Sequence, residues 1–159
     1  DEPVTALDVI VQRQILDLFN ELRNRLDLSI ILVTHDVSVV AYLCHKVAVM
    51  YDGEIVETGP VKDILEKPYH PYTIGLNNAF PDLHSTNDFL VPINGSPPNL
   101  INPPTGCRFK ARCPFEINKC KDKPDRYVNR DREAICWRTS DQKKLLEDSK
   151  KLETWEIKE

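Results

Sequence analysis

The segment that most constrains the fold is the apolar run SIILVTHD at residues 29–36. It is a continuous series of branched apolar residues closed by polar ones, which is typical of a strand buried on both faces in a parallel sheet. An amphipathic helix is predicted directly before it, over residues 8–26. A helix followed by a buried strand predicts an α/β fold. The expected apolar stripe of the helix consists of Val11, Ile15, Leu18 and Leu22, widened by Phe19 and Leu26.

Three further elements follow directly. Residues 36–43 predict a helix with Asp36 as its N-cap. Residues 46–59 predict a β-hairpin, because the Asp-Gly pair at 52–53 favours a tight turn between two strands. Residues 60–67 predict a short helix that begins at a proline.

The remainder is less regular. Residues 69–80 predict a helix weakly, and residues 81–104 predict an extended linker because prolines alternate there with Asn and Ser. Residues 107–136 carry four cysteines and are expected to form loops. Residues 139–153 predict a polar C-terminal helix with Ser140 as a candidate cap and little apolar surface.

Composition places the 159 residues among soluble globular chains, with 41% hydrophobic and 29% charged residues. The longest uncharged apolar stretch is too short to cross a bilayer, and no export signal is evident, so a cytoplasmic location is expected. The net charge of −4 conceals a basic block at residues 106–138, with 10 Lys and Arg against 5 Asp and Glu. That block could bind nucleic acid, or it could compensate buried anionic thiolates. We favour the second explanation, because the cysteines lie in the same block.

The N-terminus begins with two adjacent acids, Asp1 and Glu2, and His35 closes the apolar run. In a nucleotide-hydrolysing site one carboxylate can hold Mg²⁺ while a second orients the attacking water. Ligands collect at the carboxyl ends of strands in open α/β sheets, where this order of elements would place the acids and the histidine. Taken alone, however, two adjacent acids indicate no more than a solvated N-terminus, and a single histidine after a strand is more often structural.

The order DEP, TALD, helix, strand and THD resembles the latter half of an ATP-binding cassette (ABC) ATPase. The resemblance implies that Asp1 is the magnesium-side acid, Glu2 the catalytic base and His35 the switch histidine that contacts the γ-phosphate. It also implies that TALD, ending at Asp8, contacts a second nucleotide-binding subunit. No G-x-x-x-x-G-K-[ST] phosphate loop occurs in the chain. We therefore expect a partial P-loop NTPase core that is inactive on its own.

The four cysteines have spacings C-x5-C-x6-C-x15-C. Four thiolates can hold tetrahedral zinc or a cubane iron–sulfur cluster, and the spacing alone leaves this choice open. Disulfides are disfavoured in a chain with no export signal. The fifth, Cys44, lies in an apolar segment and is expected to be a core residue. The four candidate ligands are Cys107, Cys113, Cys120 and Cys136.

The sequence KPYHPYTIGL, followed by prolines and the cysteines, resembles the C-terminal extension of oligopeptide and dipeptide ABC importer ATPases. This resemblance implies a [4Fe-4S] cluster on the four cysteines, with Arg108, Lys110 and Arg112 as candidate compensating charges. The expected organisation is an ATPase part over residues 1–66, the extension over 67–138 and a polar helix or tail over 139–159. His70 and Tyr72 are expected to have structural roles.

The resemblance implies the ATP- and Mg²⁺-dependent subunit of an importer for peptides, nickel or sugars. It would dimerise with a second ATPase subunit, bind membrane permease subunits at the cytoplasmic face, and serve an extracytoplasmic substrate-binding protein indirectly. One alternative is a stand-alone cysteine-rich zinc module. The other is a nucleic-acid binder, which the scarcity of aromatic residues among the basic ones disfavours.

Overall fold

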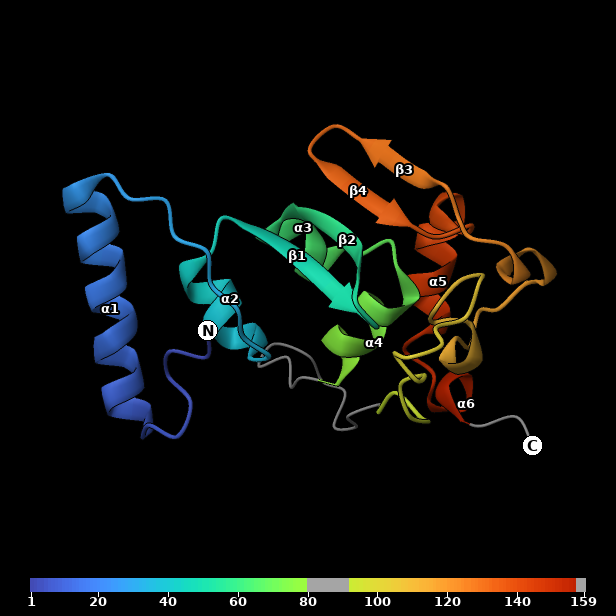
Figure 1. The fold of residues 1–159 in the computed structure, drawn as a ribbon, viewed down its shortest axis with the longest axis horizontal. Helices are drawn as coiled ribbons and strands as arrows, with labels where there is room; N and C mark the ends of the chain where they lie inside the picture. The colour runs from blue at the N-terminus through green and yellow to red at the C-terminus, as the bar shows by residue number, and fades with distance from the viewer. Residues whose placement is uncertain (80–91, 157–159) are drawn as a thin grey trace. The chain divides into compact units, whose positions relative to one another are not determined.

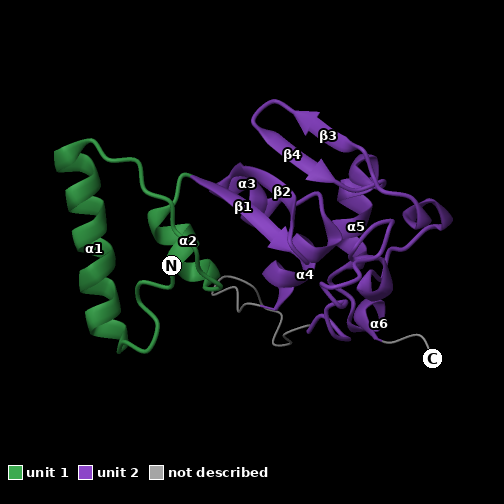
Figure 2. Cartoon of the chain, viewed as in Figure 1, with its two compact units in different colours: residues 1–45 green, residues 46–159 purple. Residues whose placement is uncertain are grey.

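The computed structural model describes residues 1–79 and 92–156 of the chain (Figure 1). It divides into two compact units, residues 1–45 and residues 46–159 (Figure 2). Residues 81–91 of the predicted linker at 81–104 therefore lie outside the described residues. Within the described ranges, no helix has both the length and the apolar character that crossing a membrane requires.

The first unit is built from α1 (Val9–Leu26) and α2 (Val37–Leu43), and both predicted helices are confirmed. Each begins where a side chain satisfies free backbone N–H groups. The Asp8 carboxylate accepts the N–H groups of the second and third residues of α1. Asp36 does the same for α2, as its position in the sequence predicted.

The core of this unit is small, and the predicted stripe on α1 is only partly buried. Leu16, outside the predicted stripe, is the buried residue of α1, whereas Leu18 and Leu26 are 45% and 55% exposed. Ile15 and Phe19 pack against the buried cluster. The buried residues of that cluster are Val4, Leu16, Val39 and Leu43.

The predicted strand at residues 29–36 is wrong. The backbone there is irregular, and the Ile31 side chain is 93% exposed. A strand is stabilised by a ladder of backbone hydrogen bonds to a neighbouring strand. Here one such bond links the segment to the N-terminal residues, from the N–H of Glu2 to the carbonyl of Val33, at 2.8 Å. The run is apolar enough for a buried strand, yet the described residues supply no parallel neighbour to pair with it.

The second unit contains a sheet with the order β1-β2-β4-β3, in which every pair is antiparallel. The predicted hairpin is confirmed as β1 (Lys46–Tyr51) and β2 (Glu54–Pro60). Asp52 and Gly53 both have positive φ, at 50° and 75°, as a tight hairpin turn requires. The unit is therefore a mixed structure of helices and antiparallel strands, and no parallel pair occurs among the described residues.

A second hairpin, β3 (Arg126–Asn129) and β4 (Arg132–Ile135), lies where loops were predicted. The two strands are short and rich in charged residues, so they lack the apolar alternation that identifies strands in a sequence. β4 is nonetheless held in the sheet, because Ala134 pairs with Glu57 of β2. The cysteine region is thus attached to the predicted hairpin by a sheet.

Four helices complete the unit: α3 (Val61–Glu66), α4 (Pro71–Asn78), α5 (Gln142–Asp148) and α6 (Leu152–Trp155). The first two confirm the predictions, although Pro60 is the N-cap of α3 and not its first helical residue. Short 3₁₀ turns span Lys110–Arg112, Asn118–Lys121 and Thr139–Asp141.

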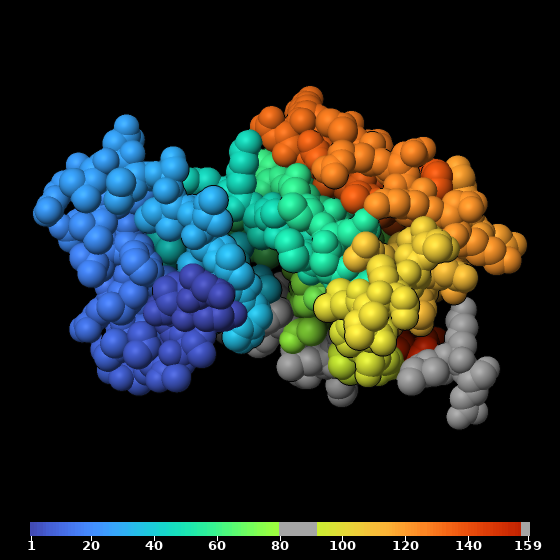
Figure 3. Space-filling model, viewed as in Figure 1, coloured from blue at the N-terminus to red at the C-terminus, as the bar shows by residue number. Residues whose placement is uncertain are grey.

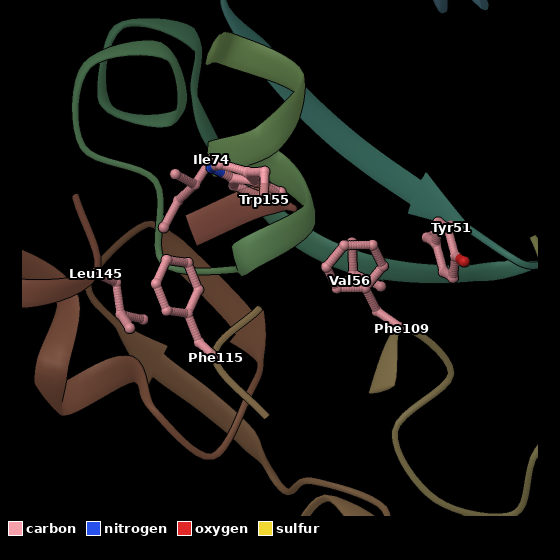
Figure 4. Packing of buried hydrophobic residues seen from close by; sticks show 7 residues of the cluster. All are labelled: Tyr51, Val56, Ile74, Phe109, Phe115, Leu145 and Trp155. Atoms are coloured by element: carbon pink, nitrogen blue, oxygen red, sulfur yellow. The ribbon is translucent and has the colours of Figure 1, made fainter. Parts of the chain in front are cut away.

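The C-terminal segment differs from its prediction, because it forms two helices that contribute to the core. Leu145 is fully buried and Trp155 is 4% exposed. The predicted cap Ser140 lies in the preceding 3₁₀ turn, and the capping position of α5 is Asp141. Figure 4 shows the seven buried side chains that converge from the strands, helices and cysteine loops: Tyr51, Val56, Ile74, Phe109, Phe115, Leu145 and Trp155.

Candidate functional sites

The structure brings together two of the predicted catalytic residues, Glu2 and His35. The imidazole Nδ1 of His35 lies 2.7 Å from Oε1 of Glu2, and the His35 backbone N–H donates to the same oxygen at 3.1 Å. The hydroxyl of Thr5 donates to the other carboxylate oxygen at 2.8 Å. A carboxylate and an imidazole 33 positions apart in the sequence are therefore in direct contact.

Each member of this pair shifts the protonation of the other. The hydrogen bond and the negative charge of Glu2 raise the pKa of His35. The hydrogen bonds from His35 and Thr5 lower the pKa of Glu2. Both side chains are open to solvent, so this contact orients the two groups without burying charge.

For the other two predicted residues of this edge, Asp1 and Asp8, the structure gives no side-chain hydrogen bond to the pair. Asp8 uses its carboxylate to cap α1, at 3.0 Å from two backbone N–H groups. Asp1 is exposed. Between them Glu2 and Ala6 have positive φ values of 44° and 64°. This conformation is uncommon for residues other than glycine, and such outliers gather at functional sites.

The four predicted cysteine ligands line one small cavity in the second unit. Two come from the loop around the first 3₁₀ turn, one from the second 3₁₀ turn, and one from the segment after β4. The backbone is tightly packed here, because a Cβ on Gly106 would lie 2.4 Å from the carbonyl oxygen of Lys121. The other lining residues are His70, Pro71, Phe109, Phe115, Pro124, Trp137 and Arg138.

Backbone N–H groups act to lower the pKa of three of these thiols. Those of Phe109 and Lys110 act on the pKa of Cys107, and that of Phe115 acts on the pKa of Cys113. The N–H of Arg138 lies 3.4 Å from the sulfur of Cys136. Such N–H donors stabilise thiolate ligands of metal centres.

Burial acts on the same thiols in the opposite direction. It raises the pKa of Cys107 and Cys113, and it raises the pKa of Cys136 to about 12. All five cysteines are free thiols. Cys44 is partly buried against the core of the first unit, where burial raises its pKa. In the described part of the chain, no three His, Cys, Asp or Glu side chains converge as the ligands of a single metal ion do.

The predicted compensating cations have other partners. Arg108 reaches across to the β1–β2 turn, where it donates to the carbonyl of Asp52 and lies 3.3 Å from the Glu54 carboxylate. In Figure 3 the segment that carries Arg108 lies against the hairpin. Lys110 pairs with Glu116 at 3.5 Å. Arg112 donates to the carbonyls of Ile93 and Asn94. These side chains fix the cysteine loop to its surroundings.

A buried polar network beside the cavity was not predicted from the sequence. The carboxylate of Glu57 is 1% exposed and accepts the backbone N–H groups of Tyr69 and His70, at 2.7 and 2.9 Å. Arg132 of β4 lies 3.2 Å from the same carboxylate. Burial raises the pKa of Glu57, and these donors act against that shift. A glutamate in an alternating strand gives no sign of burial in the sequence, so only the structure shows this role.

His70 occupies the N-cap position of α4. Its Nδ1 accepts the backbone N–H of Tyr72 at 3.1 Å, and Pro71 follows at the first helical position. The ring is 1% exposed, and burial lowers its pKa to about 3, so it is neutral. The structural role expected for His70 and Tyr72 from the sequence agrees with this geometry.

Phe109 joins this turn to the cysteine loop. Its ring centroid lies 5.2 Å from that of Tyr51, 5.4 Å from that of Tyr72 and 5.8 Å from that of His70. Its chain position lies between Cys107 and Cys113. The two sequence motifs are therefore parts of one packed structure.

Comparison with known proteins identifies the class to which these elements belong. Residues 56–120 match the family described as oligopeptide/dipeptide transporter, C-terminal region. The match begins in β2 and ends at the third cysteine of the cavity. The chain is similar to the ATP-binding proteins of oligopeptide and dipeptide transporters over a part of their length.

Individual relatives support this assignment. The chain is 48% identical over 139 residues to the dipeptide transport ATP-binding protein DppD of Bacillus subtilis, covering 86% of this chain and 42% of the relative. It is 49% identical over 124 residues to the oligopeptide transport ATP-binding protein OppD of Salmonella typhimurium, covering 78% and 37%. It is 53% identical over 117 residues to DppD of Lactococcus lactis, covering 74% and 34%. The chain thus spans less than half the length of these relatives.

Proposed function

We propose that the chain acts as the C-terminal portion of an ATP-binding subunit that energises peptide import by ATP hydrolysis. The observation that carries the proposal is the direct contact between Glu2 and His35, in a chain about half identical to peptide transport ATP-binding proteins. A carboxylate that can orient water, held beside a hydrogen-bonding imidazole, suits hydrolysis of a γ-phosphate.

In this proposal the residues have distinct roles. Glu2 polarises the attacking water, Asp1 serves Mg²⁺, and His35 contacts the γ-phosphate. Asp8 takes part in contact with a second ATPase subunit. Residues 1–66 complete the nucleotide-binding domain, residues 67–138 form the extension and residues 139–159 close the chain. Because the sequence contains no phosphate loop, this portion alone should not hydrolyse ATP.

The proposed assembly follows from the same relationship. The subunit would work as a homo- or heterodimer, bound to membrane permease subunits on the cytoplasmic side, and an extracytoplasmic binding protein would deliver the cargo. Peptides are the cargo that the relatives' names favour. Nucleic acid is not a proposed partner, since many cations of the basic block already pair with carboxylates or backbone carbonyls.

A chimera tests this function. The N-terminal part of Bacillus subtilis DppD would be joined to this chain at Asp1, and dipeptide uptake and phosphate release would be measured in cells and membranes lacking native DppD. We expect uptake to be restored, and Glu2→Gln in the chimera to lower phosphate release about 100-fold, because the base that orients water is lost. Asp27→Asn, at the end of α1, is the matched acidic control. A chimera that assembles with the permease but shows equal hydrolysis with and without Glu2 would contradict the proposal.

We further propose that the four cysteines hold a [4Fe-4S] cluster, with zinc as the alternative. What supports the cluster is that four thiols from three chain segments line one cavity and that the backbone N–H of Arg138 lies 3.4 Å from the sulfur of Cys136. Zinc is the alternative because four thiolates also suit a tetrahedral zinc site. When bound, the cluster would cross-link these segments through iron–sulfur bonds.

Metal analysis after anaerobic purification distinguishes the two. We expect about four iron and four sulfide per chain and absorbance near 400 nm. Cys120→Ser should abolish most of this, whereas Cys44→Ser, outside the cavity, should leave it unchanged. One zinc per chain without sulfide would establish the alternative. Retention of iron by the Cys120→Ser protein would refute both ligand sets.

A further inference from the structure

A second cavity of the second unit is a groove of about 410 Å³, a volume typical of sites for small ligands. It lies where β2 begins and β4 ends, beside the segment that leads into β3. Its walls come from Glu54 and Ile55 of β2, from Ile135 of β4 and from residues 123–126. None of the four cysteines lines it.

One wall of the groove is an unpaired stretch of sheet edge. On one side, β2 pairs with β1 from Glu54 to Pro60. On its other side, the register with β4 covers Glu57 and Thr58. Within the described residues, no strand therefore lies beside Glu54 and Ile55 on that side. An edge of this kind can accept an extended backbone as an added strand.

The backbone of Ile55 is the part of this edge that is turned toward the open side. Glu54 pairs with Tyr51 across the two-residue turn, and alternate residues of a strand direct their N–H and C=O groups to opposite sides. Ile55 thus directs these groups away from β1. Its side chain is 40% exposed and, with Ile135, gives the groove apolar surface next to the hydrogen-bonding edge.

The groove also carries charges of both signs. Lys123 contacts Glu54, and Arg126 contacts Glu133, in pairs that are open to solvent and therefore weak. An ammonium has three donors and a guanidinium five, so both cations can take a further acceptor. Asp125 is exposed and forms no ion pair within the described part of the chain. The groove therefore suits a ligand with one anionic and one cationic end.

We propose that this groove binds a short peptide with free termini, extended along the start of β2. The peptide main chain pairs with Ile55, its terminal carboxylate meets Lys123 and Arg126, and its terminal ammonium meets Asp125. The volume of the groove fits a ligand of a few residues. No residue of the groove has a role in the proposed ATP hydrolysis, so peptide binding here can occur whether or not that function is correct.

Isothermal titration calorimetry of the 159-residue chain with the peptide Ala-Ala-Ala measures this binding. We expect trialanine to bind at least about tenfold more tightly than N-acetyl-trialanine amide, which lacks both terminal charges, and than alanine, which lacks the peptide groups. Arg126→Gln should weaken the binding of trialanine about tenfold, because a charge-assisted hydrogen bond is lost. Lys121→Gln, at an exposed lysine that does not line the groove, is the matched control and should leave the affinity unchanged.

Selective ¹⁵N labelling of isoleucine locates the ligand. We expect the amide signal of Ile55 to shift when trialanine is added, while that of Ile74, which is buried in the core, stays in place. No binding of trialanine at millimolar concentration, or equal binding of the free and blocked peptides, overturns the proposal. Binding that leaves the Ile55 signal unchanged, or that is equal in Arg126→Gln and wild type, also overturns it. If Arg126→Gln loses the native circular dichroism spectrum, Lys123→Gln takes its place with the same expected loss of affinity.

Discussion

Replacing Glu57 with alanine is expected to lower the free energy of unfolding of the second unit by about 3–5 kcal/mol. The carboxylate is buried, accepts the backbone N–H groups of Tyr69 and His70, and lies 3.2 Å from the Arg132 guanidinium. Alanine would leave that guanidinium and both N–H groups buried without their partner. Removal of one member of a buried ion pair costs far more than the intact pair contributes.

Urea unfolding followed by tryptophan fluorescence measures this effect, because Trp137 and Trp155 both belong to the second unit. Glu133→Ala is the matched control: this glutamate lies in the same sheet, pairs with Arg126 and is partly exposed. Its loss should cost less than about 1 kcal/mol. Equal losses in the two variants would show that Glu57 does not anchor the turn formed by His70-Pro71-Tyr72-Thr73 (the HPYT turn).

Elements defined by local chemistry could be predicted from the sequence. Asp36 is a short-range hydrogen-bond acceptor and begins its helix as predicted, and the helix expected over residues 8–26 is present, with Asp8 as a cap that was not predicted. Asp52 and Gly53 favour positive φ values, which fixed the first hairpin. These predictions succeeded because the determining residues lie within a few positions of the element.

Elements defined by distant partners could not be predicted. Residues 29–36 have the composition of a buried strand but lack a ladder in the described residues. Conversely, β4 has little strand character in its sequence and is recruited by pairing with β2. In both cases the availability of a neighbouring strand outweighs the local pattern.

Some features of the candidate sites could likewise be predicted from the sequence, and others could not. The sequence order of Glu2 and His35 predicted their meeting, and the structure places them in contact. The cysteine spacing predicted four candidate ligands, which line one cavity, and it could not distinguish zinc from a cluster. Glu57 and Arg132 were not predicted as a buried pair. The residues next to a charged side chain in the sequence do not show that it is buried, and here the partner is 75 positions away.

The co-occurrence of HPYT and the cysteines has a physical explanation in Phe109. It lies between two candidate ligands in sequence and packs on three rings that belong to β1 and the HPYT turn. Cysteine ligands on loops must be positioned by the surrounding scaffold. Here the scaffold is the turn itself, so neither motif would hold its geometry without the other.

Phe109→Ala is accordingly expected to destabilise the second unit by about 3–5 kcal/mol and to reduce the iron retained after anaerobic purification. The side chain is 1% exposed, and its removal would leave a cavity between the cysteine loop and the HPYT turn. Ile101→Ala, at a position that is 83% exposed, is the control and should change the free energy of unfolding by no more than about 0.5 kcal/mol. Urea unfolding and iron analysis of the same preparations measure both effects. Strong destabilisation with undiminished iron would mean that the cysteine loop holds its ligands independently of the turn.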